Sequence, residues 1–277
     1  MKTFVLWMLF GAWGCLFVRG ETTPADQPLQ DEKETVIACE LSKAPKHGEV
    51  PVFAGKDGEA AMGTYHYKLW LPKGYHDDVK QSWPCMFIAS PSGNANMGHM
   101  APWLKANGYV VVMLVESKNG DWPPIVGNFL AAHDDVVKRV RILDGLKFAT
   151  GQSGGARASS VFAQIRPGFA GLVLQSAGAA SDATGAYAVT KLKGGRAPFV
   201  AMTMGETDKN KPEVQRMKTA IGSTHFDAFP FDGGHDWAPQ DVFEKAMSWL
   251  ELQVYRQKDS SPAVKKILQP RCGKAGK

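Results

Sequence analysis

The sequence lacks the features that mark several large classes of protein. It has only four cysteines in 277 residues, and it has no low-complexity tract, no internal repeat and no block of like charge. A disulfide-rich scaffold, a solenoid and a disordered charged chain are therefore excluded. The hydrophobic fraction is 44% and the charged fraction is 21%. This balance suffices for the core of one large α/β domain.

Motifs that bind common cofactors are also lacking. The chain contains no His-x-x-x-His and no paired-cysteine spacing, which are patterns typical of zinc sites. It contains neither Gly-x-Gly-x-x-Gly nor the phosphate-binding Gly-Lys-Ser/Thr, so no nucleotide-binding loop is predicted. We therefore expect an activity that uses no metal and no other cofactor.

The one long apolar run lies at the start of the chain. Residues 4–18 are uncharged and mostly apolar, and they follow Lys2. Small residues at the end of this segment suit cleavage before Glu21, which predicts a secretory signal peptide over residues 1–20. The run is shorter than the roughly 18 residues of a membrane span, so no stable span is expected. We predict a secreted or periplasmic protein.

A less favoured alternative for this segment is lipid attachment at Cys15. A lipid-attachment signal has small side chains before its cysteine, but here Trp13 stands in that region.

Cleavage after residue 20 would remove two basic residues and leave a net charge of about +3. This modest charge gives no reason to expect a nucleic-acid partner. Residues 21–45 are expected to form a flexible leader, and residues 46–277 are expected to form the folded domain.

Three cysteines would remain in the exported chain. We predict a disulfide between Cys39 and Cys272, because it would tie both ends of an exported domain together. Cys85 lies inside an apolar run and is expected to behave as a small buried hydrophobe. The alternative is that all three thiols are unpaired, since sequence alone does not give the Cα separation that a disulfide needs.

Apolar periodicity predicts alternating strands and helices. Strands are predicted at residues 65–71, 86–89, 109–115, 146–149, 170–174, 198–204 and 225–231, and helices at residues 97–107, 128–143, 156–165 and 239–257. Several of the strands are continuous apolar runs, which is typical of strands buried on both faces of a parallel sheet. Right-handed crossovers then give a three-layer α/β fold with a mostly parallel central sheet. Residues 175–198 leave room only for a short cap insert.

A serine lies between glycines where a predicted strand meets a predicted helix. Gly151-Gln152-Ser153-Gly154-Gly155 follows the strand at residues 146–149. A sharp turn of this kind lifts a serine hydroxyl into a cleft, and small residues prevent clashes across the turn. Ser153 would then lie at a helix N-terminus, where the Gly154 N–H and the helix dipole stabilise an oxyanion. The motif therefore predicts Ser153 as a nucleophile.

A serine nucleophile needs a base and a group that orients the base. Asp208 and His235 each follow a predicted strand directly, at the sheet edge where open α/β sheets place their sites. We predict His235 as the base and Asp208 as its orienting acid. Asp182 and Glu206 remain alternatives for the acid, because both lie in loops after predicted strands.

Four segments together resemble a known family, and the resemblance covers roughly residues 60–255. They are Leu71-Pro72-Lys73-Gly74-Tyr75, Gly151-Gln152-Ser153-Gly154-Gly155, Gly205-Glu206-Thr207-Asp208 and Gly233-Gly234-His235-Asp236-Trp237. The chain is similar to serine hydrolases of the α/β-hydrolase fold, and more narrowly to the secreted esterase and polyhydroxyalkanoate-depolymerase-like branch. This resemblance implies an acyl-transfer site with Ser153, His235 and Asp208 as the catalytic triad.

The segment after the strand predicted at residues 86–89 departs from that family. Members usually carry His-Gly there, beside the backbone N–H that completes the oxyanion hole, whereas this chain has Ala89-Ser90-Pro91-Ser92-Gly93. Proline has no N–H to donate. We therefore expect Gly154 and either Ser92 or Gly93 to supply the oxyanion-hole donors.

The sequence thus predicts a secreted, cofactor-free serine hydrolase that cleaves carboxylic esters through an acyl-enzyme. The short insert at residues 175–198 favours an open cleft and therefore small-molecule or polymeric esters. A peptidase or amidase of the same fold is one alternative, because the same triad cleaves amides. A non-catalytic binding protein that retains the fold is another, given the altered oxyanion segment.

Overall fold

The computed structural model describes residues 28–43, 45, 59–182 and 184–273. The predicted signal peptide and Cys15 lie outside these residues. The strands are β1 Glu34–Leu41, β2 Gly63–Trp70, β3 Trp83–Ala89, β4 Val110–Leu114, β5 Ile142–Gln152, β6 Phe169–Gln175, β7 Phe199–Gly205 and β8 Phe226–Phe231. The helices are η1 Gly98–Met100, α1 Ala101–Ala106, α2 Trp122–Arg139, α3 Gly154–Ile165, α4 Glu213–Ile221, α5 Gln240–Arg256 and α6 Pro262–Cys272.

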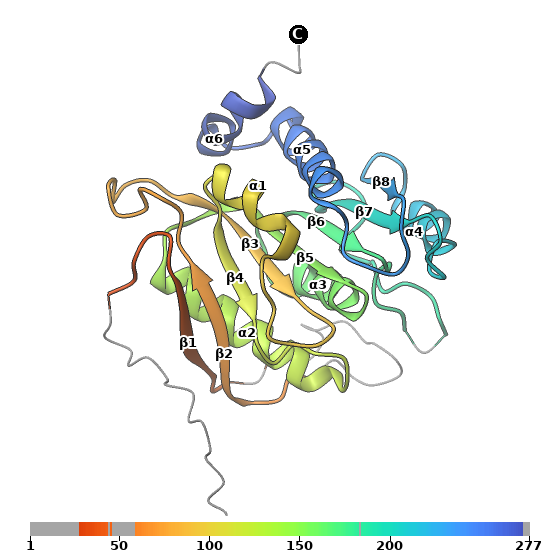
Figure 1. Cartoon of the computed structure of the whole chain (residues 1–277), viewed down its shortest axis with the longest axis horizontal. Helices are drawn as coiled ribbons and strands as arrows, with labels where there is room; N and C mark the ends of the chain where they lie inside the picture. The colour runs from red at the N-terminus through yellow and green to blue at the C-terminus, as the bar shows by residue number, and fades with distance from the viewer. Residues whose placement is uncertain (1–27, 44, 46–58, 183, 274–277) are drawn as a thin grey trace, which may run out of the picture.

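The strands form one sheet in the order β1-β2-β4-β3-β5-β6-β7-β8. β1 and β2 run antiparallel to their neighbours, whereas β4, β3 and β5 through β8 are parallel to one another. Helices cover both faces, with α2, α3 and α4 on one side and α1, α5 and α6 on the other (Figure 1). The expected three-layer α/β fold with a mostly parallel sheet is confirmed.

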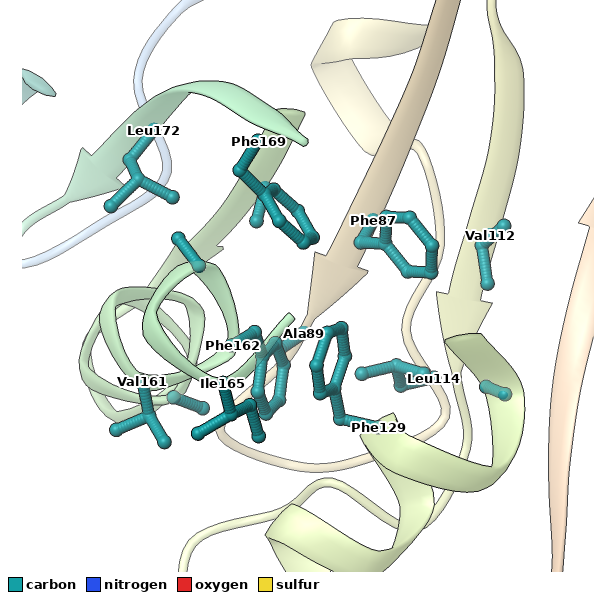
Figure 2. Close-up of a cluster of buried hydrophobic side chains, with 14 of the residues drawn as sticks. Phe87, Ala89, Val112, Leu114, Phe129, Val161, Phe162, Ile165, Phe169 and Leu172 are labelled. Carbon is teal, nitrogen blue, oxygen red and sulfur yellow. The ribbon is translucent and has the colours of Figure 1, made fainter. Parts of the chain in front are cut away.

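Alternation along the inner strands divides the core into two layers. In β3, Phe87 and Ala89 face the α2 and α3 side, while Met86 and Ile88 face the α1 and α5 side. On the first side, the rings of Phe129 from α2 and Phe162 from α3 stack with centroids 4.0 Å apart (Figure 2). These contacts fix α3, and therefore its N-terminus, against the centre of the sheet.

The expected flexible leader is wrong for residues 34–41, which form β1 and pair with β2. Ile37, Cys39 and Leu41 alternate with exposed residues and are buried in the core. The exposed positions of this strand mix glutamates with apolar residues, so no clear alternation of polar and apolar residues marks its one buried face in the sequence.

The expected disulfide is also wrong, because Cys39 and Cys272 are free. Cys39 belongs to the core layer under α2 and α3, whereas Cys272 lies in the layer on the opposite face of the sheet. Cys85 is buried and free as well. Burial raises the pKa of Cys39 to about 12 and that of Cys272 to about 11, so neither forms a thiolate readily near neutral pH.

The helix predicted at residues 128–143 lies further toward the N-terminus. It is α2, which begins at Trp122 with prolines in its first turn and ends at Arg139. Prolines fit there because the first helical N–H groups have no partner within the helix. The last predicted residues instead begin β5. Helices α4 and α6 were not predicted. Among the described residues, no helix is long and apolar enough to cross a membrane.

Candidate active site

Ser153 occupies a strained turn between β5 and α3. Its backbone has φ 55° and ψ −117°, a conformation that non-glycine residues rarely adopt. The neighbouring glycines make the turn possible, because a Cβ at Gly151 would lie 2.4 Å from the Gly155 carbonyl carbon. A Cβ at Gly155 would lie 2.4 Å from the carbonyl oxygen of Ala89. The expected sharp strand-to-helix turn is therefore present.

The turn presents Ser153 at the carboxyl edge of the sheet and at the start of α3. The Ser153 N–H donates to the Gln175 carbonyl at 2.8 Å, which ties the turn to the end of β6. Gly154 is the first residue of α3, and both Ser153 and Gly154 are half-buried. The positive end of the helix dipole therefore lies beside the serine hydroxyl.

The structure brings Ser153, His235 and Asp208 into one chain of hydrogen bonds. The Ser153 Oγ lies 2.8 Å from His235 Nε2. The other ring nitrogen, Nδ1, lies 3.0 Å from each carboxylate oxygen of Asp208. The Asp208 side chain is fully buried, while that of His235 is 31% exposed. A buried carboxylate thus orients an imidazole that is partly exposed to solvent.

The loop of Asp208 is held to the loop of His235. The Asn210 N–H donates to Asp208 Oδ1 at 2.8 Å, which supports the carboxylate from its own loop. Thr207 donates both its N–H, at 3.0 Å, and its hydroxyl, at 2.9 Å, to the carbonyl of Gly233. These bonds fix the spacing between the acid and the imidazole.

The two alternative acids have other partners. Asp182 Oδ1 accepts from the Thr184 N–H at 2.8 Å and from the Ala186 N–H at 3.1 Å, within its own turn. The hydroxyl of Thr184 and these N–H groups lower the pKa of Asp182. Glu206 is exposed and forms an ion pair with Lys211. The structure therefore brings Asp208, rather than either alternative, to His235.

Ser176, which the sequence analysis did not single out, joins the acid and base loops. It lies directly after β6 with φ 55° and is buried. Its hydroxyl donates to the Asp236 carbonyl at 2.7 Å, and its own carbonyl accepts from Asn210 Nδ2 at 2.9 Å. Its position could have indicated a place in the site, because Ser176 follows a buried strand directly, as Asp208 and His235 do.

Two buried glutamines extend this support. Gln175 accepts from the Ala238 N–H at 3.0 Å and donates to Thr150 Oγ1 at 3.0 Å. Gln152 Nε2 donates to the His235 carbonyl at 3.4 Å. The backbone from His235 to Ala238 is thus bound to the ends of β5 and β6.

The segment expected to complete the oxyanion hole has few free donors. The Gly93 N–H donates to the Ser90 carbonyl at 3.0 Å, and the Ser92 N–H lies 3.3 Å from Ser90 Oγ. Pro91 lacks an N–H. Either Ser92 or Gly93 would therefore have to exchange an existing contact for one to an oxyanion.

An ion pair behind the site joins α3 to α4. Arg157 Nη2 lies 2.8 Å from Glu213 Oε1, and Glu213 Oε2 accepts from the Gly178 N–H at 2.7 Å and from Tyr187 Oη at 3.0 Å. Burial opposes ionisation of Glu213, but Arg157 and these donors outweigh it and lower the pKa of Glu213. The pair supports the loop after β6 from beneath.

Within the described part of the chain, no three His, Cys, Asp or Glu side chains are grouped so that they could hold a metal ion. The chemistry available at the site is instead that of a serine hydroxyl, an imidazole and a buried carboxylate. That set suits nucleophilic attack on a carbonyl, with the imidazole as proton acceptor.

The order of strands, the helices on both faces and the serine turn after β5 define the α/β-hydrolase fold. No protein-family model matches the chain, and no curated protein matches it either. Solved structures do match in fold. S-formylglutathione hydrolase from Staphylococcus aureus aligns with a TM-score of 0.53 and 13% identity, over 79% of this chain and 99% of that one.

Two further solved structures carry the same fold. A ferulic acid esterase aligns with a TM-score of 0.52 and 12% identity, over 86% of this chain and 100% of that one. A prolyl endopeptidase aligns with a TM-score of 0.52 and 15% identity, over 88% of this chain but only 40% of the other. At such identities the likeness establishes the α/β-hydrolase fold. The narrower resemblance to polyhydroxyalkanoate depolymerases stays a prediction.

Proposed function

We propose that the protein is a secreted serine hydrolase that cleaves carboxylic esters through an acyl-enzyme. The observation that carries this proposal is the unbroken chain from Ser153 Oγ through His235 to the buried Asp208 carboxylate. Export is supported by the signal-peptide pattern of residues 1–20.

The proton arrangement follows from the hydrogen-bonding groups. An ionised carboxylate only accepts, so His235 donates Nδ1–H to Asp208 and leaves Nε2 to accept from the Ser153 hydroxyl. When Ser153 Oγ attacks the ester carbonyl carbon, its proton passes to Nε2. The carbonyl oxygen becomes an oxyanion, which the Gly154 N–H and the N-terminus of α3 stabilise.

Collapse of the tetrahedral intermediate breaks the bond to the leaving oxygen. His235 then gives its proton to that oxygen, so the alcohol leaves and the acyl group stays on Ser153. A water molecule then removes the acyl group: His235 accepts its proton as the water oxygen attacks the acyl carbon. The bond from that carbon to Ser153 Oγ breaks, His235 returns the proton to Oγ, and the carboxylic acid is released. Asp208 stabilises the imidazolium in both halves and stays ionised.

The partly exposed His235 and the half-buried Ser153 favour an open site. Such a site suits small-molecule or polymeric esters, which reach the serine without a large lid. The names of the solved neighbours include an esterase and an endopeptidase. Amide cleavage is therefore the second candidate, and the choice depends on measured leaving-group preference.

The test is labelling of the purified protein with a fluorophosphonate, read by intact mass, beside the Ser153→Ala variant. We expect one adduct on the wild type and none on Ser153→Ala, together with hydrolysis of a short-chain nitrophenyl ester. A folded wild type that takes no label would favour a non-catalytic binding protein instead. A matched pair of ester and anilide substrates with the same acyl group then separates an esterase from an amidase.

A further inference from the structure

The proposed mechanism leaves half of the oxyanion hole without an obvious donor. Gly154 supplies one N–H from the start of α3. Opposite it, Pro91 has no N–H, and the Gly93 N–H is already bonded to the Ser90 carbonyl. Acyl-transfer sites commonly use two donors on the developing negative charge. The second one must therefore come from a neighbouring segment or from a displaced contact.

The loop after β4 brings a side-chain amide to this place. The Asn119 N–H donates to the Pro91 carbonyl at 2.8 Å, and Lys118 forms a β-bridge with Ser92. Asn119 is thus attached by its backbone to the very segment that lacks a free N–H. Its side chain reaches over the serine turn, because a Cβ on Gly154 would lie 1.7 Å from Asn119 Oδ1 and 3.4 Å from Nδ2.

We propose that the side-chain amide of Asn119 is the second oxyanion donor, acting together with the Gly154 N–H. This inference rests on the proposed function, since it assigns a role within the same acyl transfer. Asn119 would be a catalytic residue, because its Nδ2–H contacts the reacting oxygen. From the sequence, only the backbone N–H groups of Ser92 and Gly93 were expected as second donors, so Asn119 was not predicted.

The amide is free to play this part. Asn119 is exposed, and no hydrogen bond of its side chain to another described residue is found. A half-turn about χ2 exchanges Oδ1 and Nδ2, and this torsion is broad in asparagine. A neutral resting site tolerates either orientation. A negative oxygen beside Gly154 attracts the NH₂ group and repels Oδ1, so the developing charge itself selects the donating orientation.

Gly154 has a second function in this arrangement. Besides presenting its N–H, it is the residue whose missing side chain leaves room for Asn119, since any Cβ there would overlap the amide. Replacement of Gly154 by alanine should therefore displace Asn119 while it keeps the backbone N–H. This substitution offers an independent perturbation of the same contact.

The experiment compares wild type with Asn119→Ala and Asn119→Asp on a nitrophenyl ester, with Lys118→Ala as a control for disturbance of the same loop. We expect Asn119→Ala to lower kcat about 10²–10³-fold, the loss typical of one oxyanion donor, with KM changed only a few-fold. Asn119→Asp, which keeps the shape but supplies no donor, should lose at least as much. Lys118→Ala should stay close to the wild type.

A thionoester substrate separates a donor from a merely structural residue. Its sulfur accepts hydrogen bonds weakly, so an enzyme with a full oxyanion hole strongly prefers the oxygen ester. Asn119→Ala should shrink this preference, whereas a structural fault would slow both substrates equally. Equal slowing, or a kcat of Asn119→Ala within about threefold of wild type, would overturn the role of Asn119.

Fluorophosphonate labelling keeps this failure distinct from failure of the proposed function. A wild type that labels at Ser153 and hydrolyses the ester, with Asn119→Ala equally active, would refute only the Asn119 assignment. A folded wild type that neither labels nor hydrolyses any ester would refute both. Circular dichroism and the thermal midpoint of each variant establish that it is folded.

Discussion

The two sides of Ser153 are built differently. On the side of β6, β7 and β8, Asp208 is fully buried, and its loop is bonded to the loop of His235 through Thr207 and through Ser176. On the side of β3 and β4, the backbone donors are mostly engaged, and the side chain of Asn119 is an exposed polar group that reaches Gly154. In the proposed mechanism, proton transfer is thus supported by a hydrogen-bonded network, and charge stabilisation by a loop.

The difference follows from what each task requires. An orienting carboxylate acts only if it stays charged while buried, which demands several donors and a fixed geometry. An oxyanion donor acts on a charge that exists only transiently, so an amide at the surface can turn toward it when needed. We therefore expect substitution of the orienting carboxylate to cost more turnover than substitution of the proposed oxyanion donor.

The largest loss is expected from Ser153→Ala, because both sides act through this hydroxyl. Turnover of a nitrophenyl ester should fall about 10⁴–10⁶-fold, close to the level that binding and the oxyanion donors alone sustain. Steady-state kinetics on protein purified without contact with other esterases measures this. The thermal midpoint should not fall, since the strained backbone at φ 55° is kept and no core contact is lost. Residual activity above one hundredth of wild type would show that another nucleophile acts.

The acid side is tested by Asp208→Asn against Asp182→Ala. Asparagine at 208 can hold His235 in the wrong tautomer, with Nε2 protonated, so kcat should fall by about 10⁴-fold. Asp182→Ala should stay within about twofold of wild type, because its carboxylate is engaged in its own turn. The reverse outcome, with Asp182→Ala the inactive variant, would show that Asp182 rather than Asp208 is the orienting acid.

Ser176→Gly should cause a smaller loss of turnover and show how much the hydrogen bonds that hold the His235 loop contribute to it. Glycine keeps the positive φ and removes only the hydroxyl that donates to the Asp236 carbonyl. Loosening of the His235 loop should lower kcat about 10-fold with little change in KM. The pH–rate profile should also change, because His235 would no longer be held in one position. Ser176→Ala, which keeps the backbone strain that glycine relieves, should be less stable than Ser176→Gly. An unchanged kcat and profile in Ser176→Gly would limit this residue to a structural role.

The comparison also explains what could be predicted from the sequence. The inner strands are continuous apolar runs, and polar residues directly after them meet at one edge of a parallel sheet, so Ser153, Asp208 and His235 could be predicted as neighbours. Asn119 and Ser176 could not, because their roles depend on loops that approach one another only in the folded chain. A single asparagine or serine in a loop carries no spacing pattern.

The missed strand β1 and the wrongly expected disulfide also result from contacts between segments that are far apart in the sequence. β1 was missed because its exposed face mixes glutamates with apolar residues, and its partner β2 lies more than twenty residues away along the chain. The disulfide between Cys39 and Cys272 was expected from the ends of the chain, but the two thiols face opposite layers of the core. Which face a residue occupies is set by pairing across the sheet, and that information is not local.

The smallest effect on turnover is expected behind the site, at Glu213. Its pKa is lowered in the folded state, because Arg157 and its other donors outweigh the effect of burial. Its contribution to stability is therefore present above the pKa of the unfolded chain and is lost as the pH falls through the folded value. Glu213→Gln should lower the free energy of unfolding at pH 7 by about 2 kcal/mol, the scale of a hydrogen bond to a charged group.

Urea unfolding at pH 7 and at about pH 4, near the ordinary glutamate pKa, tests whether the stabilisation by Glu213 is lost as the pH falls. The wild type should lose stability toward acid more steeply than Glu213→Gln, so the two curves converge as the pH falls. Asp241→Asn, which breaks the exposed pair with Lys245, is the control and should keep the wild-type midpoint within error. Parallel curves for wild type and Glu213→Gln would mean that the ion pair does not stabilise the folded state. Unchanged ester hydrolysis in Glu213→Gln would show that the network around Asp208 keeps its geometry without it.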